Sequence, residues 1–170
     1  MKAVWMAVIA VATLCGCVSA PKTAKIPAVS NFEAERYMGT WYEVARLPHS
    51  FERGLTNSTA VYTLRADGKV NVANSGTKDG RRQSAHAIAK FKGSSTTGEL
   101  RVSFFRPFYG DYRIIYLEPD YSAAIVTSGT FDYFWILSRT PRLPTAQLEK
   151  YVKLAKGWGF PTEKIEYPVQ

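Results

Sequence analysis

The sequence predicts an all-β fold, an eight-stranded antiparallel up-and-down barrel with a short N-terminal helix and a C-terminal α-helix packed outside it. Two observations predict this architecture. Short segments rich in β-branched and aromatic residues recur at even spacing and are separated by turns. Beyond the last of them, apolar residues recur at helical spacing instead. A meander of this kind loses its exposed edges when it closes on itself, which favours a barrel.

The N-terminal residues differ in composition from the rest of the 170-residue chain. Lys2 precedes an apolar run at residues 3–14, which is the layout of a secretory signal and is too short to span a membrane. The run leads into a Leu-Cys-Gly-Cys motif ending at Cys17, which resembles a bacterial lipobox and so implies a lipid on that cysteine. An ordinary secretion signal is the alternative. We expect a signal peptide at residues 1–16, a lipidated N-terminus and tether at 17–30, and a single domain at 31–170.

The first element of that domain is expected to be a short helix that leads into the first strand. Asn31 is a plausible helix cap, and Phe32 and Tyr37 supply the apolar side chains of the helix. Gly39 then permits a sharp reversal into an extended run at residues 41–44. A long loop at 47–55 follows.

The other strands are expected where alternating segments lie between turn residues. Gly68 and Gly80 occupy turns between pairs of them, because glycine adopts positive φ freely. The predicted strands lie at residues 56–64, 69–75, 83–91, 99–105, 111–117, 122–127 and 133–138.

A C-terminal helix is expected to cover the outside of the barrel. Pro141 stops the last strand, Gly157 and Gly159 end the helix, and residues 163–167 can add a short final strand. Its apolar residues fall on one face, at Leu148, Tyr151, Val152 and Ala155.

Several motifs resemble a known family. Gly39-Thr40-Trp41 resembles the Gly-x-Trp signature of lipocalins, and Arg139 follows the last predicted strand where lipocalins carry a conserved arginine. The segments 51–54 and 103–110 resemble further bacterial lipocalin sequence. Together they make the chain similar, over most of its length after residue 31, to bacterial lipocalins of the outer-membrane lipoprotein, apolipoprotein D-like type.

The resemblance implies roles for the signature residues and shows one departure. In this family the arginine, here Arg139, lies across the tryptophan of the first strand, here Trp41, at the closed end of the barrel. The second signature, normally Thr-Asp-Tyr, reads Pro119-Asp120-Tyr121, so the turn is kept but a threonine hydroxyl is lost. The signature residues are therefore expected to be structural: Gly39, Trp41, Asp120, Tyr121 and Arg139.

The residues that face the barrel interior follow from alternation, if Trp41 points inward. Ala85, Ala87 and Ala89 on one strand leave volume that a packed core would not tolerate, which predicts a hollow barrel. Asn74 falls on the same inner face, where it would bind a ligand head group or water, or be satisfied by the protein itself. The predicted ligand-binding residues are Ala60, Tyr62, Val72, Asn74, Ala87, Ala89, Val102, Phe104, Ile114, Tyr116, Tyr133 and Trp135.

The chain carries no sequence motif typical of catalysis or metal binding. The two histidines, His49 and His86, have no metal-ligand motif around them, and no nucleophile motif occurs. Cleavage before Cys17 would leave one cysteine, already bound to lipid, so neither a disulfide nor a cysteine nucleophile is expected. Glu43 and Glu52 could in principle form an acid–base pair, but surface carboxylates are far commoner than catalytic ones. We expect no cofactor, no metal and no enzyme activity.

The formal net charge of +8 bears on the partners of the protein. Its basic residues are scattered over many segments of a secreted chain, which argues against nucleic acid. Attraction to an anionic membrane surface or lipid is one explanation of the charge. A surface that only keeps the protein soluble is the other.

The function implied by the resemblance is binding of a long-chain lipid, a fatty acid such as palmitate or a lysophospholipid, for storage or transport in envelope lipid maintenance. Its head group is expected near loop 47–55, with Arg81 and Arg82 close by. The expected location is the outer membrane, attached by the lipid anchor and facing the periplasm. A lipid-modifying envelope enzyme and a structural lipoprotein without a ligand are the alternatives. The sequence leaves open whether the protein is a monomer or a homodimer.

Overall fold

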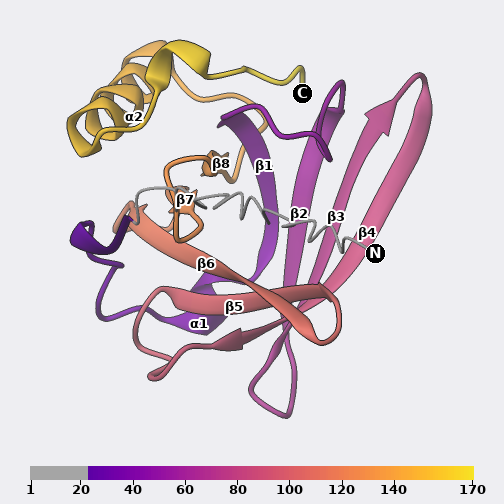
Figure 1. Cartoon of the computed structure of the whole chain (residues 1–170), viewed down its shortest axis with the longest axis vertical. Helices are drawn as coiled ribbons and strands as arrows, with labels where there is room; N and C mark the ends of the chain where they lie inside the picture. The colour runs from indigo at the N-terminus through magenta and orange to yellow at the C-terminus, as the bar shows by residue number, and fades with distance from the viewer. Residues whose placement is uncertain (1–22) are drawn as a thin grey trace, which may run out of the picture.

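The computed structural model describes residues 23–170 and confirms the predicted fold class. Eight antiparallel strands close a barrel in the order of the chain, and each strand pairs with its sequence neighbours (Figure 1). The elements are η1 (Thr23–Lys25), α1 (Ala34–Tyr37), β1 (Gly39–Arg46), β2 (Thr56–Leu64), β3 (Val70–Lys78), β4 (Arg81–Phe91), β5 (Glu99–Phe105), β6 (Phe108–Leu117), β7 (Ala123–Thr127), β8 (Phe134–Ser138), α2 (Thr145–Trp158) and η2 (Thr162–Lys164).

The two ends of the barrel differ. Because neighbouring strands are antiparallel, loop 47–55 and the β3–β4, β5–β6 and β7–β8 turns lie at one end, which we call the open end. The start of β1 and the β2–β3 turn lie at the other, the closed end, which α1 covers (Figure 1). At the open end, residues 81–86 of β4 are exposed on both faces of the strand, so the inner wall is accessible to solvent there.

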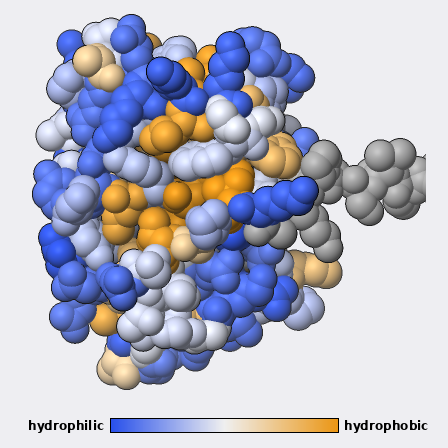
Figure 2. All heavy atoms as spheres, turned by 90° about the vertical axis from the view of Figure 1, so that its left-hand side faces the viewer, coloured by the Kyte–Doolittle hydropathy of each residue, from blue (hydrophilic) through white to orange (hydrophobic). Residues whose placement is uncertain are grey.

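Apolar side chains form two cores. One fills the barrel interior and includes Trp41 and Ile114, both fully buried. The other lies between the barrel and α2, where Tyr151 and Ala155 are fully buried against the outer faces of the strands. Figure 2 shows a band of hydrophobic residues on the face that carries α2, so part of the outer core reaches the surface.

The C-terminal helix is confirmed. Its predicted apolar face packs into the outer core, with Tyr151 and Ala155 at the centre. Gly159 ends it in the left-handed conformation at φ 94°, and its N–H donates to the carbonyls of Ala155 and Lys156. Gly157 lies inside the helix, so the prediction that it helps to end the helix was wrong.

Three other local predictions were wrong. Asn31 does not cap α1: it has a φ of 53°, and the helix begins three residues later with Glu33 as its N-cap. The expected final strand is replaced by η2 and a single bridge between Glu166 and Arg46. The connection between the third and fourth strands is also shorter than expected, because both strands continue to a tight turn at Asp79 and Gly80, with φ of 51° and 72°.

Candidate ligand-binding site

The closed end of the barrel is built on Trp41, and the predicted packing of Arg139 on it is confirmed. The Arg139 Cζ atom lies 3.9 Å from the centre of the Trp41 ring. Its guanidinium donates to the carbonyls of Thr40 at 2.9 Å and Arg36 at 2.8 Å, and the Trp41 Nε1–H donates to the Tyr37 carbonyl at 2.8 Å. Gly39, at φ 94°, brings the chain into β1 beside this arginine. These contacts tie α1, β1 and the end of β8 together.

The second signature keeps its turn although it lacks the threonine. Asp120 accepts a hydrogen bond from the Ser122 N–H at 3.0 Å, and Tyr121 adopts a φ of 61°. The Tyr121 hydroxyl accepts from the Glu33 N–H at 2.9 Å, and Arg36 lies 4.1 Å from the Tyr121 ring centre. The turn is therefore held to Glu33 and to α1 by the contacts of Tyr121, without a threonine hydroxyl.

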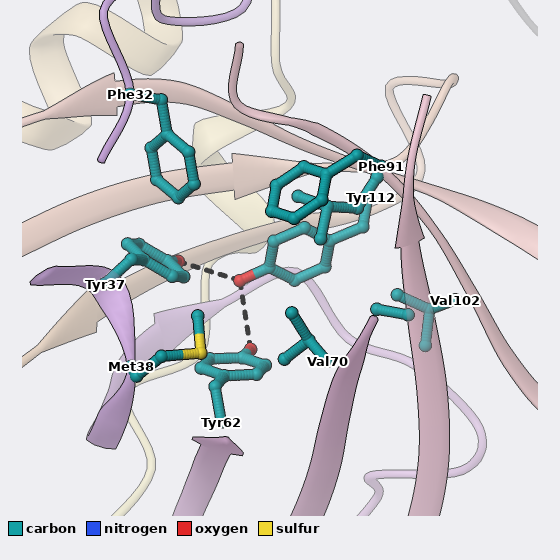
Figure 3. A pocket seen from close by; sticks show the side chains of 10 residues that line it. Phe32, Tyr37, Met38, Tyr62, Val70, Phe91, Val102 and Tyr112 are labelled. Carbon is teal, nitrogen blue, oxygen red and sulfur yellow. Dashed lines mark hydrogen bonds between the residues drawn. The ribbon is translucent and has the colours of Figure 1, made fainter. Parts of the chain in front are cut away.

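Three tyrosine hydroxyls meet in the half of the barrel next to the closed end (Figure 3). The Tyr112 hydroxyl lies 2.8 Å from that of Tyr37 and 2.9 Å from that of Tyr62. Burial raises the pKa of Tyr62 to about 12 and raises the pKa values of Tyr37 and Tyr112 as well, so the three remain neutral donors and acceptors. A buried hydroxyl is costly unless it is paired, and here each one has a partner.

An apolar pocket lies beside these tyrosines, and it is small. Its volume is about 10 Å³, which is room for about one water molecule. Met38 and Phe91 border it opposite Tyr62 and Tyr112 (Figure 3). The prediction of a hollow barrel is thus wrong for the half next to the closed end. The volume that Ala87 and Ala89 leave is taken up by larger side chains from other strands and from α1.

Most of the predicted lining residues do face the barrel interior. They pack in or against the inner core: Ala60, Tyr62, Val72, Ala87, Ala89, Val102, Ile114 and Trp135. Phe104 and Tyr133 lie at the open end and are 42% and 36% exposed. Asn74 pairs with Ala60 across the inner face, and its Oδ1 atom is buried without a hydrogen-bond partner in the described chain.

Tyr116 was assigned to the wrong face. The register of β6 shifts between Ile114 and Tyr116, which marks a β-bulge. An extra residue reverses the alternation beyond it. Tyr116 therefore points outward, where its ring packs on Tyr151 of α2 and its hydroxyl donates to Glu118 at 3.0 Å.

The half of the barrel next to the open end holds a buried charged network that the sequence reasoning missed. Arg46 is 2% exposed and donates to the Glu43 carboxylate at 2.8 Å and to the Glu52 carbonyl at 2.8 Å. The Glu52 carboxylate accepts from the Trp135 Nε1–H at 3.1 Å. Arg46 also contacts the Glu166 carboxylate at 3.4 Å. One guanidinium thus contacts two carboxyl groups, those of Glu43 and Glu166, and the backbone carbonyl of Glu52.

The protonation of this network follows from burial and from the excess of acids. Burial, and then the negative charge of Glu52, raises the pKa of Glu43 to about 8. Burial also raises the pKa of Glu52. His49 shows the opposite shift, because burial and then the charge of Arg46 lower its pKa to about 4. Near neutral pH, the site therefore holds a protonated carboxyl group and a neutral imidazole.

We expect stability to fall as pH rises above 6.5. The folded protein holds a proton on Glu43 that the unfolded chain releases at a lower pH, so stability is lost as pH rises toward 8. The shift of His49 has the opposite sign but acts only between its folded pKa of about 4 and its unfolded value of 6.5. From pH 6.5 to 8 the expected loss is about 2 kcal/mol. Urea unfolding at both values should show it, and Glu43→Gln should remove it. An equal slope in the variant would contradict the assignment.

Unpaired polar atoms gather around the same end. His49 is stacked 4.9 Å from Tyr133 and 5.2 Å from Phe51, measured between ring centres. Its Nε2 atom and the Ser58 Oγ atom are buried without a hydrogen-bond partner in the described chain, like Asn74 Oδ1. Buried polar atoms are normally paired. Bound water or the polar part of a ligand would satisfy them.

The C-terminal residues complete the wall next to this network. β1 pairs with β2 only at residues 39–42, near the closed end. Toward the open end the two strands separate, and the last residues of the chain run along the gap between them. Arg46 and Glu166 exchange backbone hydrogen bonds, and the Asn57 N–H donates to the Val169 carbonyl at 2.6 Å. The Gln170 side chain donates to the Glu43 carbonyl at 2.6 Å.

The residues missed at the sequence level fall into two groups. Tyr112 shares the alternation of Ile114 and could have been found by extending that pattern. The charged network could not, because Arg46 and Glu166 lie 120 positions apart. Within residues 23–170, no group of acidic, histidine or cysteine side chains is arranged to hold a metal ion. Nor is any helix of this region long and apolar enough to cross a bilayer.

Comparison with known proteins gives a consistent result. The family model of the lipocalin-like domain matches residues 32–170. The outer membrane lipoprotein Blc of Vibrio cholerae is 43% identical over 173 residues, covering 100% of this chain and 99% of that protein. Its namesake in Escherichia coli (strain K12) is 44% identical over 151 residues, covering 88% of this chain and 85% of that protein. Apolipoprotein D of Rattus norvegicus is 33% identical, covering 74% of this chain and 71% of that protein.

Solved structures support the fold. Insecticyanin from the tobacco hornworm Manduca sexta superposes with a TM-score of 0.69, covering 85% of this chain and 84% of its own, at 18% identity. That identity is too low to carry more than the fold. The family match and the identities to bacterial lipoproteins establish the family and the location. The chain belongs to the lipocalin family, to its branch of bacterial outer-membrane lipoproteins, and its location is the outer membrane.

Proposed function

We propose that this lipocalin binds a long-chain amphiphile, a fatty acid or a lysophospholipid, and carries or stores it for maintenance of the envelope lipids. Its family and its bacterial relatives support a binding protein for a small hydrophobic ligand. The chain length and head group are part of the proposal. Attachment to the outer membrane through Cys17, which lies outside the described residues, is part of it too.

The observation that carries this proposal is the change of polarity along the barrel axis. Toward the closed end, the wall is apolar, with Val70, Val72 and Ala89 all at least 96% buried. Toward the open end, buried groups include polar and charged ones, and four of their atoms have no hydrogen-bond partner within residues 23–170: His49 Nε2, Ser58 Oγ, Asn74 Oδ1 and Ser103 Oγ. An amphiphile with its acyl chain directed inward and its head group at the open end matches this gradient.

The small volume of the pocket beside the three tyrosines sets a condition on binding. A space of about 10 Å³ cannot take an acyl chain, so side chains that line the pocket must move when one enters. Met38 is suited to this, because an unbranched thioether side chain repacks readily. Transfer of about sixteen methylenes at roughly 0.8 kcal/mol each gives about 13 kcal/mol, against a cost of about 4 to 15 for association and ordering. The expected dissociation constant is therefore about micromolar or somewhat lower.

Displacement of a fluorescent fatty acid from delipidated protein tests the proposal. Palmitate and a lysophospholipid should displace it, with affinity rising with chain length until the barrel is full. Ala87→Trp should weaken binding about tenfold or more, since it adds an indole to the inner wall and blocks the volume of several methylenes. His86→Trp is the matched control, because its side chain is exposed on the outer face of the same strand. Failure of both lipids to displace the probe would leave the structural lipoprotein as the better explanation.

Anchoring is tested separately through Cys17. A single acyl chain holds a protein only marginally, whereas an N-terminal cysteine with several chains holds it firmly. Cys17→Ser should therefore abolish labelling by radioactive palmitate and remove the protein from the outer-membrane fraction. Cys15→Ser should keep both, because that cysteine is removed with the signal peptide. Full outer-membrane fractionation of the Cys17 variant would contradict the anchor.

A lipid-modifying enzyme is not favoured by the site. The structure does bring Glu43 and Glu52 together, but Glu43 is engaged by Arg46 and Glu52 by Trp135. Carboxyl groups held in this way serve the structure of the open end. Turnover of a bound lipid by the purified protein would change this conclusion.

A further inference from the structure

The open end of the barrel carries exposed aromatic side chains at the β5–β6 turn. Phe105 is 81% exposed and Phe108 is 77% exposed, and they flank Arg106 and Pro107. The turn lies on the opposite side of the barrel from α2 (Figure 1). Large apolar side chains that gather on an otherwise polar surface mark an interaction site.

Other groups at the same end extend this surface. Phe51, on loop 47–55, is 63% exposed and lies 5.2 Å from His49 between ring centres. Next to the β5–β6 turn, the Tyr109 ring is approached by Lys90 Nζ at 4.6 Å and by Arg101 Cζ at 5.7 Å. Between residues 100 and 110 the chain has no acidic side chain.

The open end carries more exposed basic than acidic side chains. Its loop and turns have four exposed basic residues, Arg53, Arg81, Arg82 and Arg106, against two exposed acidic ones, Asp79 and Asp132, while Lys78 and Glu52 are each partly exposed. The segments at the closed end are nearly balanced. Their basic residues are Arg36, Arg65, Lys69, Lys92, Arg139 and Arg142, and their acidic residues are Glu33, Glu35, Asp67, Glu118 and Asp120. Aromatic side chains beside an excess of basic charge match the interface of an anionic bilayer.

The start of the described chain lies at the same end. The Thr23 N–H donates to the Gly129 carbonyl in the β7–β8 turn at 3.1 Å. Only residues 18–22 separate Thr23 from Cys17. Even a fully extended chain of this length spans only about 20 Å. A lipid on Cys17 would therefore hold this edge of the open end near the membrane.

We infer that the open end docks on the surface of a lipid bilayer, with Phe105 and Phe108 inserted among the lipids and Arg106 at the level of the phosphates. Docking does not depend on the cargo, and it goes beyond the proposed function. If the cargo is a lipid, docking lets it move between the bilayer and the barrel without crossing water. The Thr23 argument rests on the anchoring proposed above, whereas the exposed aromatic residues and the charge do not.

Vesicle co-sedimentation tests the inference. Residues 18–170 contain the whole barrel and both of its cores, so this chain is used without the lipid and the apolar N-terminal run. It should bind vesicles of phosphatidylethanolamine and phosphatidylglycerol and bind pure phosphatidylcholine more weakly. The double variant Phe105→Ser/Phe108→Ser should bind the anionic vesicles at least about tenfold more weakly. Val61→Ser is the control, since it removes a 37% exposed side chain from the barrel wall.

Three outcomes of these binding measurements would overturn the inference. Equal binding by the double variant and the natural chain would show that the phenylalanines do not insert. Binding that Arg106→Gln and salt abolish, but that the double variant keeps, would mean electrostatic adsorption alone. A dimer that the double variant converts to monomers, with vesicle binding unchanged, would make the surface an interface between copies. Displacement of the fluorescent fatty acid is measured in parallel, and its loss in the natural chain would reject the cargo and leave docking standing.

Discussion

Trp41→Ala should lower the free energy of unfolding by about 3 to 5 kcal/mol, a large share of the stability of a domain of this size. The indole is fully buried, lies 4.7 Å from the Tyr37 ring between centres, and is covered by the guanidinium of Arg139. Its loss leaves a cavity at the closed end and removes the donor to the Tyr37 carbonyl. Three elements meet on this side chain, so the barrel is expected to open at this end first.

Urea unfolding followed by far-ultraviolet circular dichroism measures the effect. Trp158→Ala is the control, because Trp158 is only partly buried, at the end of α2. Arg139→Lys should destabilise by less than Trp41→Ala, since an ammonium group cannot lie flat on the ring while donating to the carbonyls of Thr40 and Arg36. An unchanged midpoint for Trp41→Ala would show that the closed end does not depend on this packing.

The barrel could be predicted from sequence because its signals are local. Alternation gives the faces of each strand, and glycines such as Gly68 and Gly80, both at positive φ, mark the turns. The face of Tyr116 could not be predicted, because a bulge after Ile114 breaks the alternation without a residue that announces it. Asn31 failed as a cap for a related reason, since local capping preference was overridden by the path of the chain into the barrel.

The side chains that fill the barrel interior could not be predicted from the sequence. Small residues on β4 indicate free volume only if nothing else enters it, and Tyr37 enters from α1 while Tyr112 enters from β6. The charged network has the same character. Glu43 resembles a surface carboxylate in the sequence, and only the closed barrel shows that it is buried beside Arg46 and Glu52. Long-range packing decides both features.

The open end depends on Arg46 as the closed end depends on Trp41. Arg46 is 2% exposed, and its guanidinium joins β1 to loop 47–55 through the Glu52 carbonyl and to the C-terminal residues through Glu166. Arg46→Ala removes this donor and leaves Glu43 and the loop carbonyls buried without it. Removing one partner from a buried, hydrogen-bonded charged network in this way costs about 3 to 5 kcal/mol. The variant should therefore lose about that much stability and release loop 47–55, which hydrogen exchange of its amides would report.

Two further variants test why Arg46→Ala lowers the free energy of unfolding. Arg36→Ala breaks an exposed ion pair of the same spacing, to Glu33 at 2.9 Å, together with its contact to the Tyr121 ring, and should cost only about 1 kcal/mol. Arg46→Met/Glu43→Gln removes both partners of the buried hydrogen bond and should recover part of the loss, because no buried carboxyl group is left without its donor at that position. If Arg46→Ala costs no more than Arg36→Ala, the network does not hold the open end together. If the double variant is as unstable as Arg46→Ala, the loss comes from the loop carbonyls and Glu166 rather than from Glu43.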